Sequence, residues 1–266
     1  MVDKFPPAQL QAARQDRHFV TALARGLDLL ACFRSSDRLL GNQELAQRCK
    51  LPRSTVSRLS YTLTQLGYLQ YEQSAGKYRL GSATLALGSA MLSRLDVRQL
   101  ARPAMQQLAD FSGAMVSLGI RDRLSMIYIE NCRSQAALTL SLDVGSRIPI
   151  AHTAMGRAWL AITPLTERNE ILERVRQLDP DNWLSTQRGI QRALEQFQQF
   201  GCCTAIGEWQ PDVNAIAIAF CPVDGSMPIG INCGGPASAL PAEFLLGEVR
   251  PRLLAMVDQL RLAMVA

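Results

Sequence analysis

The sequence predicts an α+β protein of two domains, and three features of its 266 residues indicate this. The first 81 residues read as short helices followed by a β-hairpin, whereas the rest alternates strand-like and helical segments. The first 81 residues hold 12 Lys/Arg and 6 Asp/Glu, while the remainder holds 16 and 17. Positive charge confined to one domain is typical of nucleic-acid binding. The length also suits two domains of ordinary size.

Two helices are expected to open the N-terminal domain. The segment ALARGLDLLACF, residues 22–33, predicts the first, with four inward-facing residues: Leu23, Leu27, Leu30 and Ala31. A second, shorter helix is expected from about Gln43 to Arg48, with Asn42 as its N-cap. Residues 49–51 then form a tight connection to a third helix. Two short helices joined in this way predict a helix-turn-helix.

The third helix lies within LPRSTVSRLSYTLTQLGYL, residues 51–69. The spacing of its apolar residues predicts one buried stripe: Val56, Leu59, Leu63 and Leu66. Pro52 suits the first turn, and Gly67 suits the position after the helix end, where a positive φ is favoured. The opposite face is polar and cationic, and no acidic residue occurs between Lys50 and Tyr71.

This helix is expected to enter the DNA major groove with its N-terminal half. Short hydroxyl side chains can contact phosphates, and arginine can bond phosphates or guanine edges. Residues 68–71 and 77–80 alternate like two strands around a turn at 74–76, which completes a winged helix-turn-helix over residues 19–81. The expected DNA-binding residues are Arg53, Ser54, Thr55, Ser57, Arg58 and Tyr61 on the helix, and Lys77 and Arg79 on the wing. A small helical domain with a solvated basic face is the alternative, and the wing and the segregated charge favour DNA binding.

Residues 82–96 are expected to form a linker helix, well packed because its side chains are small and apolar. Its apolar excess suits a contact between two copies of the chain. Asp96 is expected to cap the next helix, and Pro103 is expected to bend that helix or mark its restart. The second domain then covers residues 97–266.

The second domain is expected to carry a mainly antiparallel sheet. Its strand-like segments are residues 114–120, 124–130, 136–142, 202–209, 213–220 and 227–235. Hairpin turns are expected at 121–123 and at Asp224–Gly225. Helices are expected over 153–162 and 165–175, from a cap at Ser185 or Thr186 to Gly201, and from about Pro241 to the end.

Composition disfavours several other classes of protein. No apolar run has the roughly 20 residues of a membrane span, and no apolar signal segment opens the chain, so we expect a cytoplasmic protein. The seven cysteines show no disulfide or metal-ligand spacing, which indicates thiols and no bound metal. A catalytic pairing of His152 with a cysteine has little support, so no enzyme activity and no cofactor are expected. A thiol-based redox sensor stays an alternative, although a free cysteine is often only a small buried residue.

Five motifs in this order resemble the isocitrate lyase regulator (IclR) family of bacterial transcription factors. They are ALARGLDLL, LPRSTVSRL, GKYRLG, VGSRIPIAHTAMGRAWLA and FGC…AIAIAFCPVDG…IGINCGG, and the resemblance extends from about Phe19 to the end. It implies a winged-helix DNA-binding domain, a linker helix and a GAF-like effector-binding domain. It also implies a dimer or a dimer of dimers on operator DNA. FVTALARGLDLLACF and GINCGG look closer to the branch that controls aromatic-acid catabolism.

The resemblance further implies an effector pocket in the second domain. Carried over position by position, its residues are Ala137, Leu140, Ile148, Ala154, Met155, Ala205, Glu208, Val213, Ala215, Asn232 and Gly234. Thr153 is expected to cap the helix that follows it, and the first N–H groups of that helix suit a carboxylate. Simple close packing of the small residues in TAMGRAWL is the alternative for this segment.

The sequence departs from the family pattern at several pocket positions. Ala205 stands where an acid is frequent, with Glu208 nearby, while Ala215 and Gly234 stand where small polar side chains are frequent. Arg157 replaces the usual lysine. A roomier and less polar pocket favours a small carboxylate with a ring as the effector. A small aliphatic keto acid is the alternative effector.

Overall fold

The computed structural model describes residues 16–34, 37–93, 95–134, 142–222 and 227–264. The chain divides into two compact units, Met1–Arg94 and Leu95–Ala266. Several expected features lie outside the described residues: nearly all of the strand at 136–142, the turn at Asp224–Gly225, and the pocket residues Ala137 and Leu140.

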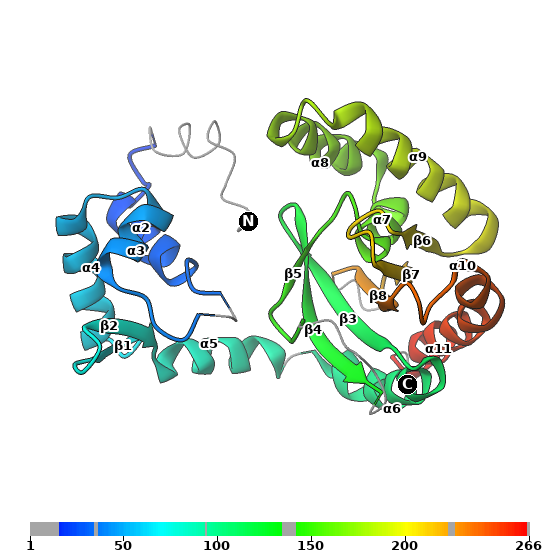
Figure 1. Ribbon diagram of the computed structural model, residues 1–266, viewed down its shortest axis with the longest axis horizontal. Coiled ribbons are helices and arrows are strands. Elements are labelled where there is room, and N and C mark those ends of the chain that lie inside the picture. The colour runs from blue at the N-terminus through cyan, green and yellow to red at the C-terminus, as the bar shows by residue number, and fades with distance from the viewer. Residues whose placement is uncertain (1–15, 35–36, 94, 135–141, 223–226, 265–266) are drawn as a thin grey trace. The chain divides into compact units, whose positions relative to one another are not determined.

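The N-terminal unit has the expected order of helix, helix-turn-helix and hairpin (Figure 1). Its described elements are α2 (Thr21–Leu30), α3 (Asn42–Cys49), α4 (Arg53–Gln65), β1 (Leu69–Glu72), β2 (Lys77–Leu80) and α5 (Ser82–Leu92). The strands are antiparallel, and a small core lies beneath them and the helices, including Leu29, Leu45, Val56 and Leu69. Gly67 follows α4 with a φ of +75°, as predicted.

The buried face of α2 differs from the prediction. Gly26 and Leu29 are buried, whereas Leu23 and Leu27 are 62% and 57% exposed and Ala31 is also exposed. The helix meets α4 through Gly26, where an added Cβ would lie 4.0 Å from Leu59 Cδ2. A position without a side chain thus faces the neighbouring helix, which turns the leucines outward.

Other details of this unit also correct the prediction. Leu66 is exposed, and Ser60 takes the buried place one turn after Val56. The N-cap of α3 is Gly41, whose N–H donates to Glu44 Oε2 at 2.9 Å, and Pro52 is the N-cap of α4. The helix α5 forms as expected but is not packed, because none of its residues is buried within the chain.

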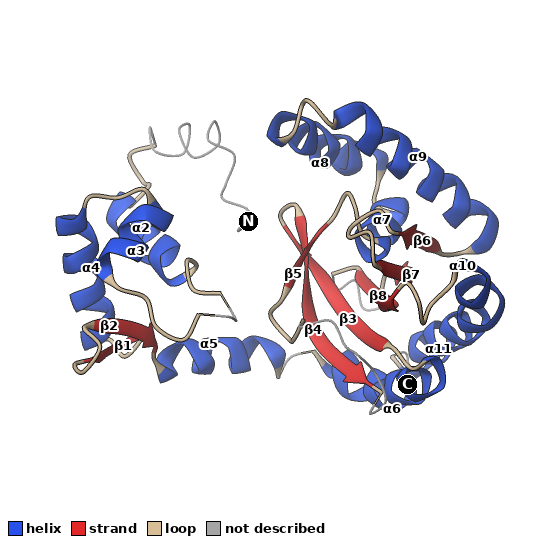
Figure 2. Cartoon of the chain, viewed as in Figure 1, coloured by secondary structure: helices blue, strands red, loops and turns tan. Residues whose placement is uncertain are grey.

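The C-terminal unit is built on an antiparallel sheet, with six strands among the described residues and helices on both faces (Figures 1 and 2). The strand order is β5-β4-β3-β8-β7-β6. The strands are β3 (Met115–Asp122), β4 (Ser125–Arg133), β5 (Arg147–Pro149), β6 (Cys203–Ile206), β7 (Val213–Phe220) and β8 (Ile229–Pro236). Helices α6 (Asp96–Ser112) and α11 (Arg250–Ala263) contact one face, and α7 (Ala154–Ile162) contacts the other. The remaining helical segments are α8 (Leu165–Leu178), α9 (Trp183–Phe200), α10 (Ala242–Phe244) and the π-turn η1 (Leu245–Val249).

Four helix details in this unit differ from the prediction. Asp96 belongs to α6, whose N-cap is Leu95. That helix runs unbroken through Pro103, which lies on its exposed side, where water can satisfy the unbonded carbonyl. Helix α9 begins at Trp183, and the Thr186 N–H already donates to Asn182 O at 3.0 Å. The final helix contains a π-turn just before Pro251, whose missing N–H cannot continue the regular bonding.

Candidate functional sites

Helix α4 presents a polar, cationic face to solvent. The exposed residues on it are Arg53, Ser54, Ser57, Arg58 and Tyr61, while Thr55 is half-buried. Val56 and Ser60 anchor the other side of the helix in the core. Asn42 Nδ2 of α3 donates to Ser57 Oγ at 3.3 Å, which ties the first helix of the motif to the start of the second.

The two wing cations already have partners within the unit. Lys77 Nζ lies 3.1 Å from Glu44 Oε2, and Arg79 Nε donates to Gln70 Oε1 at 3.2 Å. No ion pair or hydrogen bond joins the side chain of Arg58 to another described residue. A phosphate would therefore have to compete with Glu44 for Lys77, whereas Arg58 projects into solvent without such a competitor.

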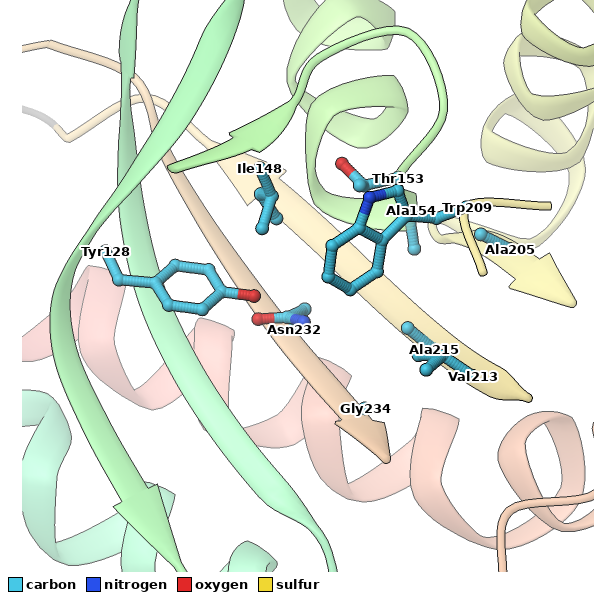
Figure 3. A pocket seen from close by; sticks show the side chains of 10 residues that line it. All are labelled: Tyr128, Ile148, Thr153, Ala154, Ala205, Trp209, Val213, Ala215, Asn232 and Gly234. Carbon is cyan, nitrogen blue, oxygen red and sulfur yellow. The ribbon is translucent and has the colours of Figure 1, made fainter. Parts of the chain in front are cut away.

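A pocket lies between α7 and strands β4, β7 and β8 of the sheet (Figure 3). Its cavity volume is about 20 Å³, which is room for about one water molecule, so a larger ligand would need the lining side chains to move apart. It is lined by Tyr128, Ile148, Thr153, Ala154, Ala205, Trp209, Val213, Ala215, Asn232 and Gly234. Seven of the expected pocket residues thus come together from five separate elements.

The pocket exists because one face of the sheet carries small side chains. Along β7, Ala215, Ala217 and Ala219 alternate with Ile216, Ile218 and Phe220, since successive residues of a strand point to opposite faces. Residue Gly234 on β8 is paired with Ala215, and a Cβ added there would lie 3.1 Å from the Ala215 Cβ. Larger residues at these two positions would fill the floor of the pocket.

Two polar groups stand at one end of this apolar space. Asn232 is 5% exposed, and its Oδ1 has no hydrogen-bond partner among the described residues. The hydroxyl of Tyr128 points toward Asn232 in Figure 3. Burial raises the pKa of Tyr128 to about 12, although side-chain hydrogen bonds with Asn232 and Ser117 lower it. Tyr128 is therefore a neutral phenol at physiological pH.

The N-terminus of α7 borders the same pocket. Thr153 caps the helix as predicted, because its Oγ1 accepts the Gly156 N–H at 3.2 Å. The N–H groups of Ala154 and Met155 have no acceptor in an ordinary helix, and no described residue supplies one. Gly156 fixes this start against the preceding loop, since a Cβ there would lie 2.1 Å from Ile150 O. The helix thus offers amide donors at the pocket wall.

Two expected pocket residues, Met155 and Glu208, do not line the pocket, and three lining residues were not expected. Met155 is fully buried against the sheet, where a Cβ added to Gly119 or Gly230 would lie 2.6 Å from its side chain. It pins α7 to the strands and does not line the pocket. The unexpected lining residues are Tyr128, Thr153 and Trp209. A two-residue alternation could have placed Tyr128 on the inner face, but no periodic signal marks Trp209, which lies between strands.

Glu208 lies beside the pocket, where it forms ion pairs with two arginines. Its Oε2 lies 2.8 Å from an Arg157 guanidinium nitrogen and 3.5 Å from one of Arg192. Arg157 is 2% exposed, and its Nε donates to Ala151 O at 2.9 Å, so it is neither a surface residue nor part of the pocket lining. The pair anchors the β6–β7 loop at the residue before Trp209, which lines the pocket.

Other kinds of site have no support in the described part of the chain. No group of three metal-ligating side chains occurs there, and no helix there is long and apolar enough to cross a membrane. Burial raises the pKa of Cys202 and of Cys233, each to about 11, and also raises that of Cys203. These three thiols are therefore poor nucleophiles.

Comparisons with known proteins match both units. The IclR helix-turn-helix domain matches residues 22–73, and the bacterial transcriptional regulator IclR C-terminal domain matches residues 89–261. The HTH-type transcriptional regulator TsaQ1/TsaQ2 of Comamonas testosteroni is 34% identical over 97% of this chain and 92% of its own.

Solved structures show the same architecture. The crystal structure of an IclR family transcriptional regulator from Brucella abortus is 45% identical, with a TM-score of 0.84 over 94% of both chains. An IclR homologue from Microbacterium hydrocarbonoxydans, complexed with 4-hydroxybenzoate, shares the fold with a TM-score of 0.72 at 22% identity, over 91% of this chain and 100% of that one. The matches to both domains, together with the relative that is similar along nearly the whole chain, show that this chain belongs to the IclR family of bacterial transcriptional regulators.

Proposed function

We propose that this regulator controls a catabolic operon in response to a small aromatic carboxylate held in the pocket of the C-terminal unit. The observation that carries the proposal is the buried Asn232 Oδ1, which has no partner among the described residues and shares an apolar pocket with the N-terminus of α7. A buried acceptor without a partner is costly, and a ligand donor would remove that cost.

The pocket has a separate place for each part of such an effector. A carboxylate is favoured at the first N–H groups of α7 by those donors and by the helix dipole. A ring would contact the apolar side chains between the polar groups, including Ile148, Val213 and Trp209. A ring hydroxyl could then donate to Asn232 Oδ1, which lies apart from Thr153 and Ala154 in Figure 3. The structural neighbour that holds 4-hydroxybenzoate supports this class of ligand.

We assign DNA binding to residues 19–81, with the eight residues named on α4 and the wing as contacts. The linker at 82–96 and the effector domain at 97–266 complete the arrangement. Effector binding changes DNA affinity only if the effector prefers one of two arrangements of the protein.

The regulator is proposed to act as a dimer or a dimer of dimers, which places two recognition helices on two half-sites. Exposed apolar side chains of the N-terminal unit support this assembly. They are Leu23 and Leu27 on α2, Leu66 after α4, and Leu85 and Leu87 on α5. A groove between α2 and α4 includes Leu23, Leu27, Leu66 and Leu87. It also includes Ser54, Thr55 and Arg58, so a partner copy would have to leave these proposed DNA contacts open. Contiguous apolar surface of this kind marks an interaction site in a folded protein.

Isothermal titration calorimetry of the full chain tests the effector class. We expect 4-hydroxybenzoate to bind more tightly than benzoate, and both to bind more tightly than pyruvate or glyoxylate. Tight binding of a keto acid with no binding of either aromatic acid would contradict the aromatic assignment and favour the aliphatic alternative.

A further inference from the structure

Two thiols of the N-terminal unit meet although they are distant in the sequence. Cys32 is the second residue after the C-terminal end of α2, and Cys49 is the last residue of α3. Their Sγ atoms lie 2.9 Å apart, and neither residue is in a disulfide. A disulfide bond is about 2.05 Å long, so the two sulfurs would have to approach by roughly 1 Å.

The surrounding contacts hold the two helix ends in this arrangement. An Arg48 guanidinium nitrogen donates to Cys32 O at 2.9 Å, which links α3 to the segment that follows α2. The other guanidinium nitrogen of Arg48 donates to Asp37 Oδ1 at 3.0 Å, in the segment between the two helices. The pairing of the thiols is therefore set by the same contacts that join α2 to α3.

The two thiols differ in access to solvent. Cys32 is buried, with 7% of its surface exposed, whereas Cys49 is half-buried. Because Cys49 is the more exposed of the two residues, we expect a small oxidant to react with it first, with the Cys32 thiol beside it. Buried Cys202, Cys203 and Cys233 lack this combination of access and a neighbouring thiol.

We propose that Cys32 and Cys49 form a reversible disulfide, a redox modification site within the DNA-binding unit. With hydrogen peroxide as oxidant, the Cys49 thiolate attacks one peroxide oxygen, which gives a sulfenic acid and, after protonation, one water. The Cys32 thiol then attacks the sulfenic sulfur, which forms the S–S bond and releases a second water. Two thiols and one peroxide thus give one disulfide and two waters, and a dithiol reductant reverses the reaction.

The disulfide bond would hold together α2 and α3, the two helices that pack against α4. Cross-linking residues 32 and 49 closes a short loop and limits local opening of α2 away from α3. Amide hydrogens of α2 and α3 should therefore exchange more slowly in the oxidised protein than in the reduced one.

The test uses the full chain treated with hydrogen peroxide, alkylated and digested without reductant before mass spectrometry. We expect a cross-linked peptide pair containing Cys32 and Cys49, lighter by two hydrogen atoms than the reduced pair and lost after dithiothreitol. Hydrogen exchange in α2 and α3 should slow on oxidation of the wild type and not of Cys32→Ser.

Cys221→Ser is the matched control, because Cys221 is exposed, and this variant should form the cross-link normally. Recovery of Cys49 as an alkylated thiol or a sulfinic acid, with Cys32 still a thiol, would overturn the proposal. A Cys49–Cys49 cross-link between two chains would overturn it as well. The wild-type result is decisive even if Cys32→Ser folds poorly.

Discussion

The cationic face of α4 and the pocket beneath α7 represent opposite ways of building a binding surface. On α4, arginines and hydroxyls stand in water on a helix whose other side is buried. In the pocket, small residues leave a space, and one buried acceptor, Asn232 Oδ1, lacks a partner among the described residues. The affinity of α4 for DNA would come from attraction between its positive side chains and phosphates. The affinity of the pocket for an effector would come from burial of apolar surface and from one hydrogen bond to Asn232 Oδ1.

Filling the space should have the largest effect. Ala215→Phe would put a ring into the pocket floor opposite Gly234, so binding of 4-hydroxybenzoate should fall below detection. Calorimetry measures the binding. DNA affinity without ligand and the circular dichroism spectrum should match the wild type, which excludes general misfolding. Retained ligand affinity in a folded Ala215→Phe variant would place the effector elsewhere.

Removing one positive charge from α4 should have the second-largest effect. Arg58→Ala should weaken binding to specific DNA by about 1–3 kcal/mol, because the variant loses the hydrogen bonds that an arginine makes to a base edge or a phosphate. Fluorescence anisotropy with a labelled duplex measures this. Arg188→Ala, which removes an exposed arginine from α9 in the other unit, is the control and should bind DNA normally. Equal affinities for Arg58→Ala and wild type would rule out this use of α4.

Removing the buried acceptor should have a comparable or smaller effect that depends on the ligand. Asn232→Leu should weaken 4-hydroxybenzoate binding by about 1–3 kcal/mol, because the ring hydroxyl would be left unpaired. Benzoate, which lacks that hydroxyl, is the matched control and should lose less. If calorimetry finds the same loss for both acids, Asn232 does not bind the hydroxyl.

Removing a wing charge should have the smallest effect. Lys77 already pairs with Glu44, so part of its attraction to phosphate is offset by the loss of that contact. Lys77→Ala should weaken binding to any DNA sequence equally and lower the slope of log K against log salt by about one unit. A salt titration of the wild type and the variant measures the slope, and an effect on one sequence alone would contradict a phosphate contact.

The same contrast explains what the sequence could and could not predict. Helix α4, the wing and the Thr153 cap follow from local signals, namely apolar spacing, a glycine at positive φ and a hydroxyl at a helix start. The face of α2 was wrong, because periodicity marks an apolar stripe without indicating which partner it meets. Helix α2 contacts α4 at Gly26, so Leu23 and Leu27 are exposed.

The pocket was predicted in part, and the reason is physical. Seven lining positions came from the family resemblance, whereas Trp209 lies in a loop whose position depends on the ion pair between Glu208 and buried Arg157. Met155 was misplaced because only the glycines of β3 and β8 show that its side chain fills the sheet contact. The thiol pair was equally hidden, since Cys32 and Cys49 come together only through helix packing.

The most direct test of the account measures whether the pocket controls the DNA-binding surface. DNA affinity of the full chain would be measured on a duplex selected by the protein from a random pool, with and without saturating 4-hydroxybenzoate. We expect the acid to change the DNA affinity of the wild type by roughly fivefold or more, in either direction, and to leave that of Ala215→Phe unchanged. An acid that changes neither protein, or both equally, would contradict regulation through this pocket.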